Sequence, residues 1–296
     1  MSVTVRDAKT RMSEQTTTQV IYKPGSPLRD PAQLLRDLAK DFAACRELAW
    51  RLLVRNISAR YRQTMLGYFW AVFPPLATTA IWLFLTRERV VEINVGNVPY
   101  PVFLVTGTIL WQTFVDAIQI PVRVISESKS MLAKINFPRE ALPITAFGEC
   151  WFNVGIRVVI LGAAYAFLGF SPATTLPLAL LGILAIIVLG LMIGLFLSPF
   201  ALLYQDVSNG LVLVCQIWMY CSPVIYLPKN TGWIGTMNRL NPVSSLLCQT
   251  RDWMLTGQTT YFHAASTVFA TTIVGMFLAF IVYRVALPRA IERLSS

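Results

Sequence analysis

Long apolar stretches of bilayer-spanning length alternate with short polar segments along most of the chain. The first two predicted spans cover about 66–85 and 100–121. The third begins at Pro143 and is separated from the fourth by the turn GFSPATT at 169–175. No charge lies in the 48 residues between Arg157 and Asp206, which is too long for one span of about 20 residues and fits the ends of two.

The last two predicted spans cover about 211–227 and 262–283. Between them, residues 228–260 are neither fully apolar nor strongly charged. Such a segment favours short re-entrant helices that dip into the outer leaflet where protein or water covers their backbone. We expect it to form an outer gate.

The N-terminal part is polar, and it changes character near residue 32. Residues 1–31 lack periodicity and are typical of a flexible arm. From residue 32 to 62, apolar positions recur every three or four residues, with arginines on another face. Residues 32–65 are therefore predicted to hold a basic amphipathic helix lying at the membrane surface, with a solvated helix packed on its own protein as the alternative.

Composition and charge support a membrane protein with its positive loops on one side. The chain is 55% hydrophobic and 14% charged, with a net charge of +10. Twelve of the 25 Lys and Arg residues lie in 1–66, four in 122–142 and three after 283. This asymmetry predicts cytoplasmic termini, including a tail at 285–296, and argues against nucleic-acid binding.

The cysteines and the absence of a nucleotide loop limit the chemistry. Five cysteines, without a C-x-x-C pair, are interpreted as small buried side chains, and no metal site is predicted. No G-x-x-x-x-G-K-[ST] motif is present, so we expect ATP to bind elsewhere.

Three charges fall inside predicted spans, where each is costly unless paired. Glu149, Asn153 and Arg157 recur every four residues on one helix face, and Asp116 lies in the second span. Structural pairing is the favoured interpretation, with an ion or proton relay as the alternative.

The stretch KINFPREALP at 134–143 interrupts the apolar pattern between the second and third spans. The preceding residues favour a helix, with Ser126 as a candidate cap, and Pro138 forces Phe137 out of helical geometry. We predict a short cytoplasmic helix at about 126–140 that ends in a stiff elbow. Taken alone, the stretch also fits an ordinary basic loop.

Six motifs, in order, resemble the polysaccharide-export permeases of the ABC-2 type. They are RNISARYRQTMLGYFWAVFPPL (55–76), VPYPVFLVTGTILWQTF (98–114), NFPRE (136–140), YQDV (204–207), QIWMYCSPVIY (216–226) and LNPVSSLLCQTRDWML (240–255). Asn56 stands where the family commonly has aspartate, which puts an ion pair there in doubt.

The resemblance implies an all-α integral membrane protein, with a six-span domain at 66–284, that forms a homodimer in the bacterial inner membrane. Two copies of a separate ATPase subunit, holding ATP and Mg²⁺, would pair with it and drive export of a lipid-linked polysaccharide of the O-antigen type. The chain itself would be a permease subunit without a cofactor, not an enzyme. The residues implied in coupling to the ATPase are Lys134, Ile135, Asn136, Phe137, Pro138, Arg139 and Glu140, and those of the interface helix are Arg55, Arg60, Tyr61 and Arg62.

A sugar polymer needs a wet conduit with aromatic faces on which its rings can slide. The candidate channel residues are Tyr68, Phe69, Trp70, Phe73, Trp111, Phe114, Trp218, Tyr220 and Tyr226. Tyr220 and Tyr226 are favoured because Pro223 between them indicates a bent helix that lines the lumen. Interfacial anchoring is the alternative for aromatic residues near span ends.

Three other functions stay open. The first is an ABC-2 exporter of capsule, teichoic acid or a small amphiphile. A membrane enzyme acting on polyprenyl-linked sugars would need a carboxylate pair or cluster, and the cytoplasmic loops contain no D-x-D. A structural scaffold would not need the proline elbow.

Overall fold

The computed structural model describes residues 31–62, 69–88, 98–134, 138–228 and 231–295. The chain divides into two compact units, residues 1–40 and 41–296, and the packing discussed below belongs to the second. All regular elements in the described ranges are helices: α1 (Pro31–Arg62), α2 (Phe69–Arg87), α3 (Tyr100–Glu127), α4 (Lys129–Lys134), α5 (Ala141–Phe167), α6 (Leu176–Leu203), α7 (Gln205–Cys221), α8 (Gly232–Leu240), α9 (Pro242–Leu255) and α10 (Phe262–Ser295).

Four of the described helices are long and apolar enough to cross a membrane. They are α3, α5, α6 and α10. The shorter apolar stretch Leu76–Arg87 belongs to α2, and α7 has 17 residues. The chain is thus a multi-pass helical membrane protein with four clear candidate spans in the part that the structure describes.

Helix α3 is the centre of the packing, because most of its side chains are buried between α5 and α6. Its backbone comes very close to α6 at two glycines. A methyl group added at Gly190 would lie 2.5 Å from Cβ of Ala117, and one added at Gly194 would lie 2.4 Å from the carbonyl oxygen of Ile118. Small residues allow membrane helices to approach this closely.

Helix α3 is longer than predicted. It continues through Pro121 to Glu127, and the backbone N–H of Ser128 donates to the carbonyl of Val124 at 3.2 Å. The prediction that Ser126 caps the cytoplasmic helix was therefore wrong, since Ser126 lies inside α3. Pro121 is tolerated because neighbouring helices compensate for the missing donor. Of the short helix predicted at about 126–140, the described residues after α3 form α4, with six residues.

Helix α7 begins and ends about six residues earlier than the predicted span at 211–227. It ends at Cys221, and Ser222 is extended, with its hydroxyl donating to the carbonyl of Trp218 at 3.0 Å. Pro223 therefore follows the helix instead of bending it, and the expected bent helix between Tyr220 and Tyr226 is not present. Pro223 has no backbone N–H with which to continue the helix.

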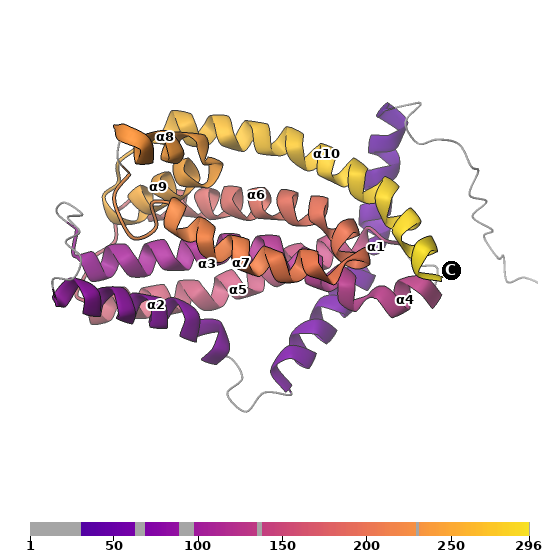
Figure 1. The fold of residues 1–296 in the computed structure, drawn as a ribbon, viewed down its shortest axis with the longest axis horizontal. Helices are drawn as coiled ribbons and strands as arrows, with labels where there is room; N and C mark the ends of the chain where they lie inside the picture. Colours follow the sequence, from indigo (N-terminus) through magenta and orange to yellow (C-terminus); the bar gives the residue numbers. More distant parts are fainter. Residues whose placement is uncertain (1–30, 63–68, 89–97, 135–137, 229–230, 296) are drawn as a thin grey trace, which may run out of the picture. The chain divides into compact units, whose positions relative to one another are not determined.

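The segment between α7 and α10 contains two short helices, as its mixed composition predicted. The side chain of Asn241 caps α9 by accepting from the backbone N–H of Val243 at 3.2 Å, and Pro242 occupies the first turn. Figure 1 shows α8 and α9 at one end of the long helices and α4 at the opposite end.

Candidate functional site

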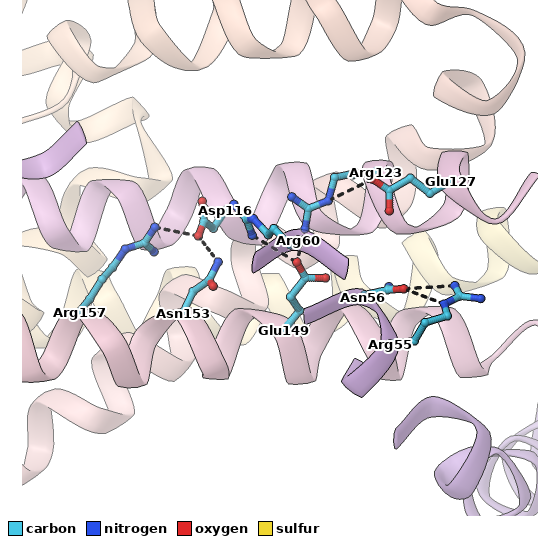
Figure 2. Close-up of polar contacts among 9 residues, drawn as sticks. All are labelled: Arg55, Asn56, Arg60, Asp116, Arg123, Glu127, Glu149, Asn153 and Arg157. Carbon is cyan, nitrogen blue, oxygen red and sulfur yellow. Dashed lines mark hydrogen bonds and ion pairs between the residues drawn. The ribbon is translucent and has the colours of Figure 1, made fainter. Parts of the chain in front are cut away.

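Polar side chains of α3 and α5 face each other inside the helical packing (Figure 2). The Asp116 carboxylate accepts from Arg157 at 2.7 Å and from the side-chain amide of Asn153 at 2.6 Å. Arg157 also donates to the hydroxyl of Thr113 at 3.5 Å. The side chains of Asp116 and Arg157 are 15% and 5% exposed, so water contributes little to their charge compensation.

The same face of α5 continues to Glu149, whose side chain is 3% exposed. Its Oε1 accepts from Arg60 of α1 at 3.3 Å and also pairs with Arg123 of α3. Arg123 lies 3.8 Å from Glu127 as well. The buried carboxylate of Glu149 thus joins α5 to both α1 and α3.

We call this set of contacts, from Arg60 to Arg157, the polar ladder (Figure 2). The predicted common face of Glu149, Asn153 and Arg157 is confirmed, and so is their structural pairing. Sequence reasoning missed Arg123 as a partner. The signal was its spacing of seven residues from Asp116, which places both on one face of α3.

The elbow after α4 is connected to the last helix. The buried hydroxyl of Tyr283 in α10 donates to the backbone carbonyl of Arg139 at 2.9 Å. Arg284 lies 3.8 Å from the carboxylate of Glu140, the residue that directly precedes α5. The elbow residues Arg139 and Glu140 therefore contact α10, and the elbow leads into α5. The predicted residues Ile135, Asn136 and Phe137 lie outside the described residues, and Lys134 ends α4.

The predicted interface-helix residues lie at the end of α1. Arg55 donates to the side-chain carbonyl of Asn56 at 3.3 and 3.1 Å, so a hydrogen bond occupies the position where the family pattern suggested an ion pair. Arg60 joins the polar ladder. The side chains of Tyr61 and Arg62 are not among those that the structure describes.

Three of the predicted channel residues form one aromatic cluster. The ring of Phe114 lies 5.4 Å from Trp111 and 5.3 Å from Trp218. Trp111 and Phe114 are buried, and the indole N–H of Trp218 donates to Asn241 at 3.2 Å. In this conformation Trp111 and Phe114 are packing residues, because their faces are covered by protein.

The other predicted channel residues differ in exposure. Tyr220 on α7 is 58% exposed and Phe73 on α2 is 44% exposed. Tyr226 is partly buried and donates to the side chain of Asn238 at 3.3 Å. The side chains of Tyr68, Phe69 and Trp70 lie outside the described part of the structure.

Two cavities lie beside the polar ladder and α4. The larger, about 690 Å³, lies between the ends of α3, α6 and α7 and is lined by Arg123, Lys129 and Gln205, among others. The smaller, about 380 Å³, is lined by Asn56, Ala59, Arg60, Arg123, Glu127 and Glu149. No group of three or more residues suited to hold a metal occurs in the described ranges.

The sequence from the middle of α1 to the end of α9 matches a known protein family. A family model described as ABC-2 type transporter matches residues 47–255, which include the polar ladder, the elbow and the aromatic cluster. The chain belongs to this family.

Several relatives are described as O-antigen export system permease protein RfbA. One from Klebsiella pneumoniae is 25% identical over 233 residues, covering 75% of this chain and 86% of the relative. A second from the same organism is 27% identical over 236 residues, with the same coverage. One from Myxococcus xanthus is 25% identical over 217 residues, covering 71% of this chain and 81% of the relative. These names describe permease subunits, not enzymes.

Within the ABC-2 family match, the polar ladder connects α1 to the candidate spans α3 and α5, and the elbow connects α4 to α5 and α10. Both arrangements are suited to moving force between helices.

Proposed function

We propose that this chain is the channel-forming subunit of an ATP-driven exporter that moves a lipid-linked polysaccharide of the O-antigen type across the bacterial inner membrane. Membership of the ABC-2 family, together with three relatives described as O-antigen export permeases, is the observation that carries the proposal. Capsule, teichoic acid or a small amphiphile is the alternative cargo.

The proposed exporter is a homodimer with six spans in each copy and cytoplasmic termini. Helices α2 and α7 supply the two spans beyond α3, α5, α6 and α10, and α8 and α9 form re-entrant gate helices. The positive charge of residues 1–66 and 122–142 supports this orientation, since basic loops stay in the cytoplasm. The exposed aromatic and aliphatic faces of α2 and α7 would form the dimer contact and the conduit.

Force enters at α4 and the elbow. A separate ATPase subunit, carrying ATP and Mg²⁺, presses on residues 129–140 when it closes around nucleotide. The elbow passes the displacement into α5 directly and into α10 through Tyr283 and Arg284. Arg60 then couples the surface helix α1 to the same movement through Glu149.

Site-specific cross-linking tests the division of labour. Ser130 is exposed on α4, and Thr256 is exposed at the end of α9, at the opposite end of the helices (Figure 1). A photo-reactive or thiol cross-linker at Ser130→Cys should capture the partner ATPase subunit, and the matched Thr256→Cys should not. The purified permease alone should not hydrolyse ATP.

Cargo is tested by deleting the gene and examining cell-surface polysaccharide. Loss of the surface polymer with accumulation of its lipid-linked precursor inside the cell supports the proposal. An unchanged surface polymer, or ATP turnover by the permease alone, contradicts it.

A further inference from the structure

Arg251, in the C-terminal third of α9, is a charged side chain buried in the helical packing. It is 2% exposed and is the largest fully buried side chain among the described residues. One of its terminal nitrogens donates to the backbone carbonyls of Pro223 at 2.9 Å and Val224 at 3.4 Å. Its guanidinium carbon lies 3.9 Å from the centre of the Phe103 ring. Within the described residues, it forms no ion pair with a carboxylate.

The charge of Arg251 is compensated by dipoles and by a π system. Arginine keeps its proton even when buried, so the full charge has to be stabilised by its surroundings. Here the carbonyl oxygens of the turn after α7 and the face of Phe103 provide that stabilisation. We call residues 222–227 the exit turn. If the exit turn moved away, the guanidinium would lose most of its partners, which is unfavourable unless water replaces them.

The exit turn is held from two sides. On the α3 side, a methyl group added at Gly107 would lie 2.4 Å from the carbonyl oxygen of Val224, so the two backbones are in direct contact. On the α9 side, the amide of Asn241 donates to the hydroxyl of Ser222 at 2.8 Å. Both of these contacts involve neutral groups. Arg251 adds a charged contact with the same turn, through the carbonyls of Pro223 and Val224.

We propose that Arg251 is a positioning residue of the outer gate, which holds the exit turn shut against α3 and α9 until water enters. The inference rests on the proposed export function, because a gate is needed only where polymer leaves. Opening replaces two carbonyl acceptors with water, so a partly opened turn would leave the charge poorly solvated. The gate therefore has a closed state and a hydrated open state, with little between them.

Distance measurement between spin labels tests this directly. Labels are placed on two exposed residues, Leu227→Cys in the exit turn and Thr256→Cys at the end of α9, with Cys221→Ser to prevent side reaction. In the full chain reconstituted in lipid nanodiscs, with labelled copies diluted by unlabelled ones so that distances within one copy are measured, the parent should give one narrow distance distribution. Arg251→Met should raise the longer-distance population by about tenfold or more, the ratio expected for losing one charge-assisted hydrogen bond.

Three further variants separate positioning from general stability. Arg251→Lys keeps the charge and should restore part of the narrow distribution. Phe103→Leu keeps the apolar volume but removes the π face. It should also raise the longer-distance population, and it provides the test if Arg251→Met does not fold. Leu240→Met changes an exposed apolar side chain at the end of α8 in the same segment and should leave the distances unchanged.

Distances that stay unchanged in folded Arg251→Met, or in folded Phe103→Leu, overturn the inference. The measurement needs neither ATPase nor polymer, so it separates this inference from the proposed function. If the distances shift as expected but deletion of the gene leaves surface polysaccharide intact, the gate is supported and the proposed cargo is contradicted.

Discussion

At the scale of single residues, two carboxylates hold the interior of the helical packing together. Asp116 accepts from both Arg157 and Asn153, and Glu149 pairs with arginines from two other helices. Each charge has a partner at close range, which offsets much of the cost of removing it from water. Their contribution is easiest to detect when one member is removed.

Replacing Arg157 with Met should destabilise the protein by about 3 kcal/mol, the lower end of the range for breaking a buried pair. The loss is limited because Asn153 still donates to Asp116. Thermal unfolding in detergent measures the effect. The double variant Asp116→Leu with Arg157→Met should recover much of the stability, since an apolar pair of similar volume removes both charges.

A matched surface pair provides the control for this experiment. Arg51 and Glu47 form an ion pair at 2.6 Å, but their side chains are 75% and 77% exposed. Arg51→Met should therefore cost only about 0–1 kcal/mol. Equal effects of Arg51→Met and Arg157→Met would contradict the assignment of a stabilising role to the polar ladder.

The sequence predicted which residues of α5 share a face, but not what they contact. A spacing of four residues is a local property of a helix and can be counted along the chain. The contact between Arg60 and Glu149 joins residues 89 positions apart, and it depends on how α1 lies against α5. Such contacts follow from tertiary packing, which a single sequence does not specify.

At the scale of elements, the contact between α3 and α6 depends on glycine. The atom that a new methyl group at Gly194 would meet belongs to the backbone of Ile118, so no side-chain rotation can make room. The α5 residue Gly155, by contrast, has nothing within 4 Å of the same position. These two glycines form a matched pair for substitution.

Gly194→Ala should destabilise the protein by about 1–3 kcal/mol, as overpacking does. Gly155→Ala should be neutral or stabilise it by up to about 1 kcal/mol, because alanine favours helix. Unfolding midpoints in detergent, measured side by side, check both. If Gly194→Ala were as stable as Gly155→Ala, the close approach of α3 and α6 would be wrong.

Helix positions were predictable from hydropathy, and helix ends were less so. Proline was expected to end or bend helices, yet α3 passes through Pro121 and α7 stops before Pro223. The difference lies in the neighbours. Pro121 is buried close to Gly194 of α6, whereas the residues after α7 form a turn that Arg251 of α9 and Asn241 hold in place.

At the scale of the whole molecule, the two ends of the long helices carry different features. Helix α4 and the elbow lie at one end, and α8 and α9 lie at the other (Figure 1). The distribution of Lys and Arg indicates which end faces the cytoplasm. Topology is therefore open to a direct chemical test.

A membrane-impermeant maleimide should label Thr256→Cys in intact spheroplasts and should label Ser130→Cys only after the membrane is permeabilised. Both positions are exposed in the structure, so a difference in labelling reports the side of the membrane. Four of the five native cysteines are buried, which keeps the background low. Labelling of Ser130→Cys from outside would reverse the orientation and remove the basis for ATPase contact at α4.

The glycine contacts between α3 and α6 also bear on how the transporter could be inhibited. With no side chain between the backbones at Gly190 and Gly194, these two helices cannot slide or tilt against each other without a collision. They form a fixed frame, and movement during each cycle falls to the helices around them. A small inhibitor that arrests the cycle would therefore act best on the exposed faces of α2 and α7, where Phe84 and Ile217 offer apolar contact surface.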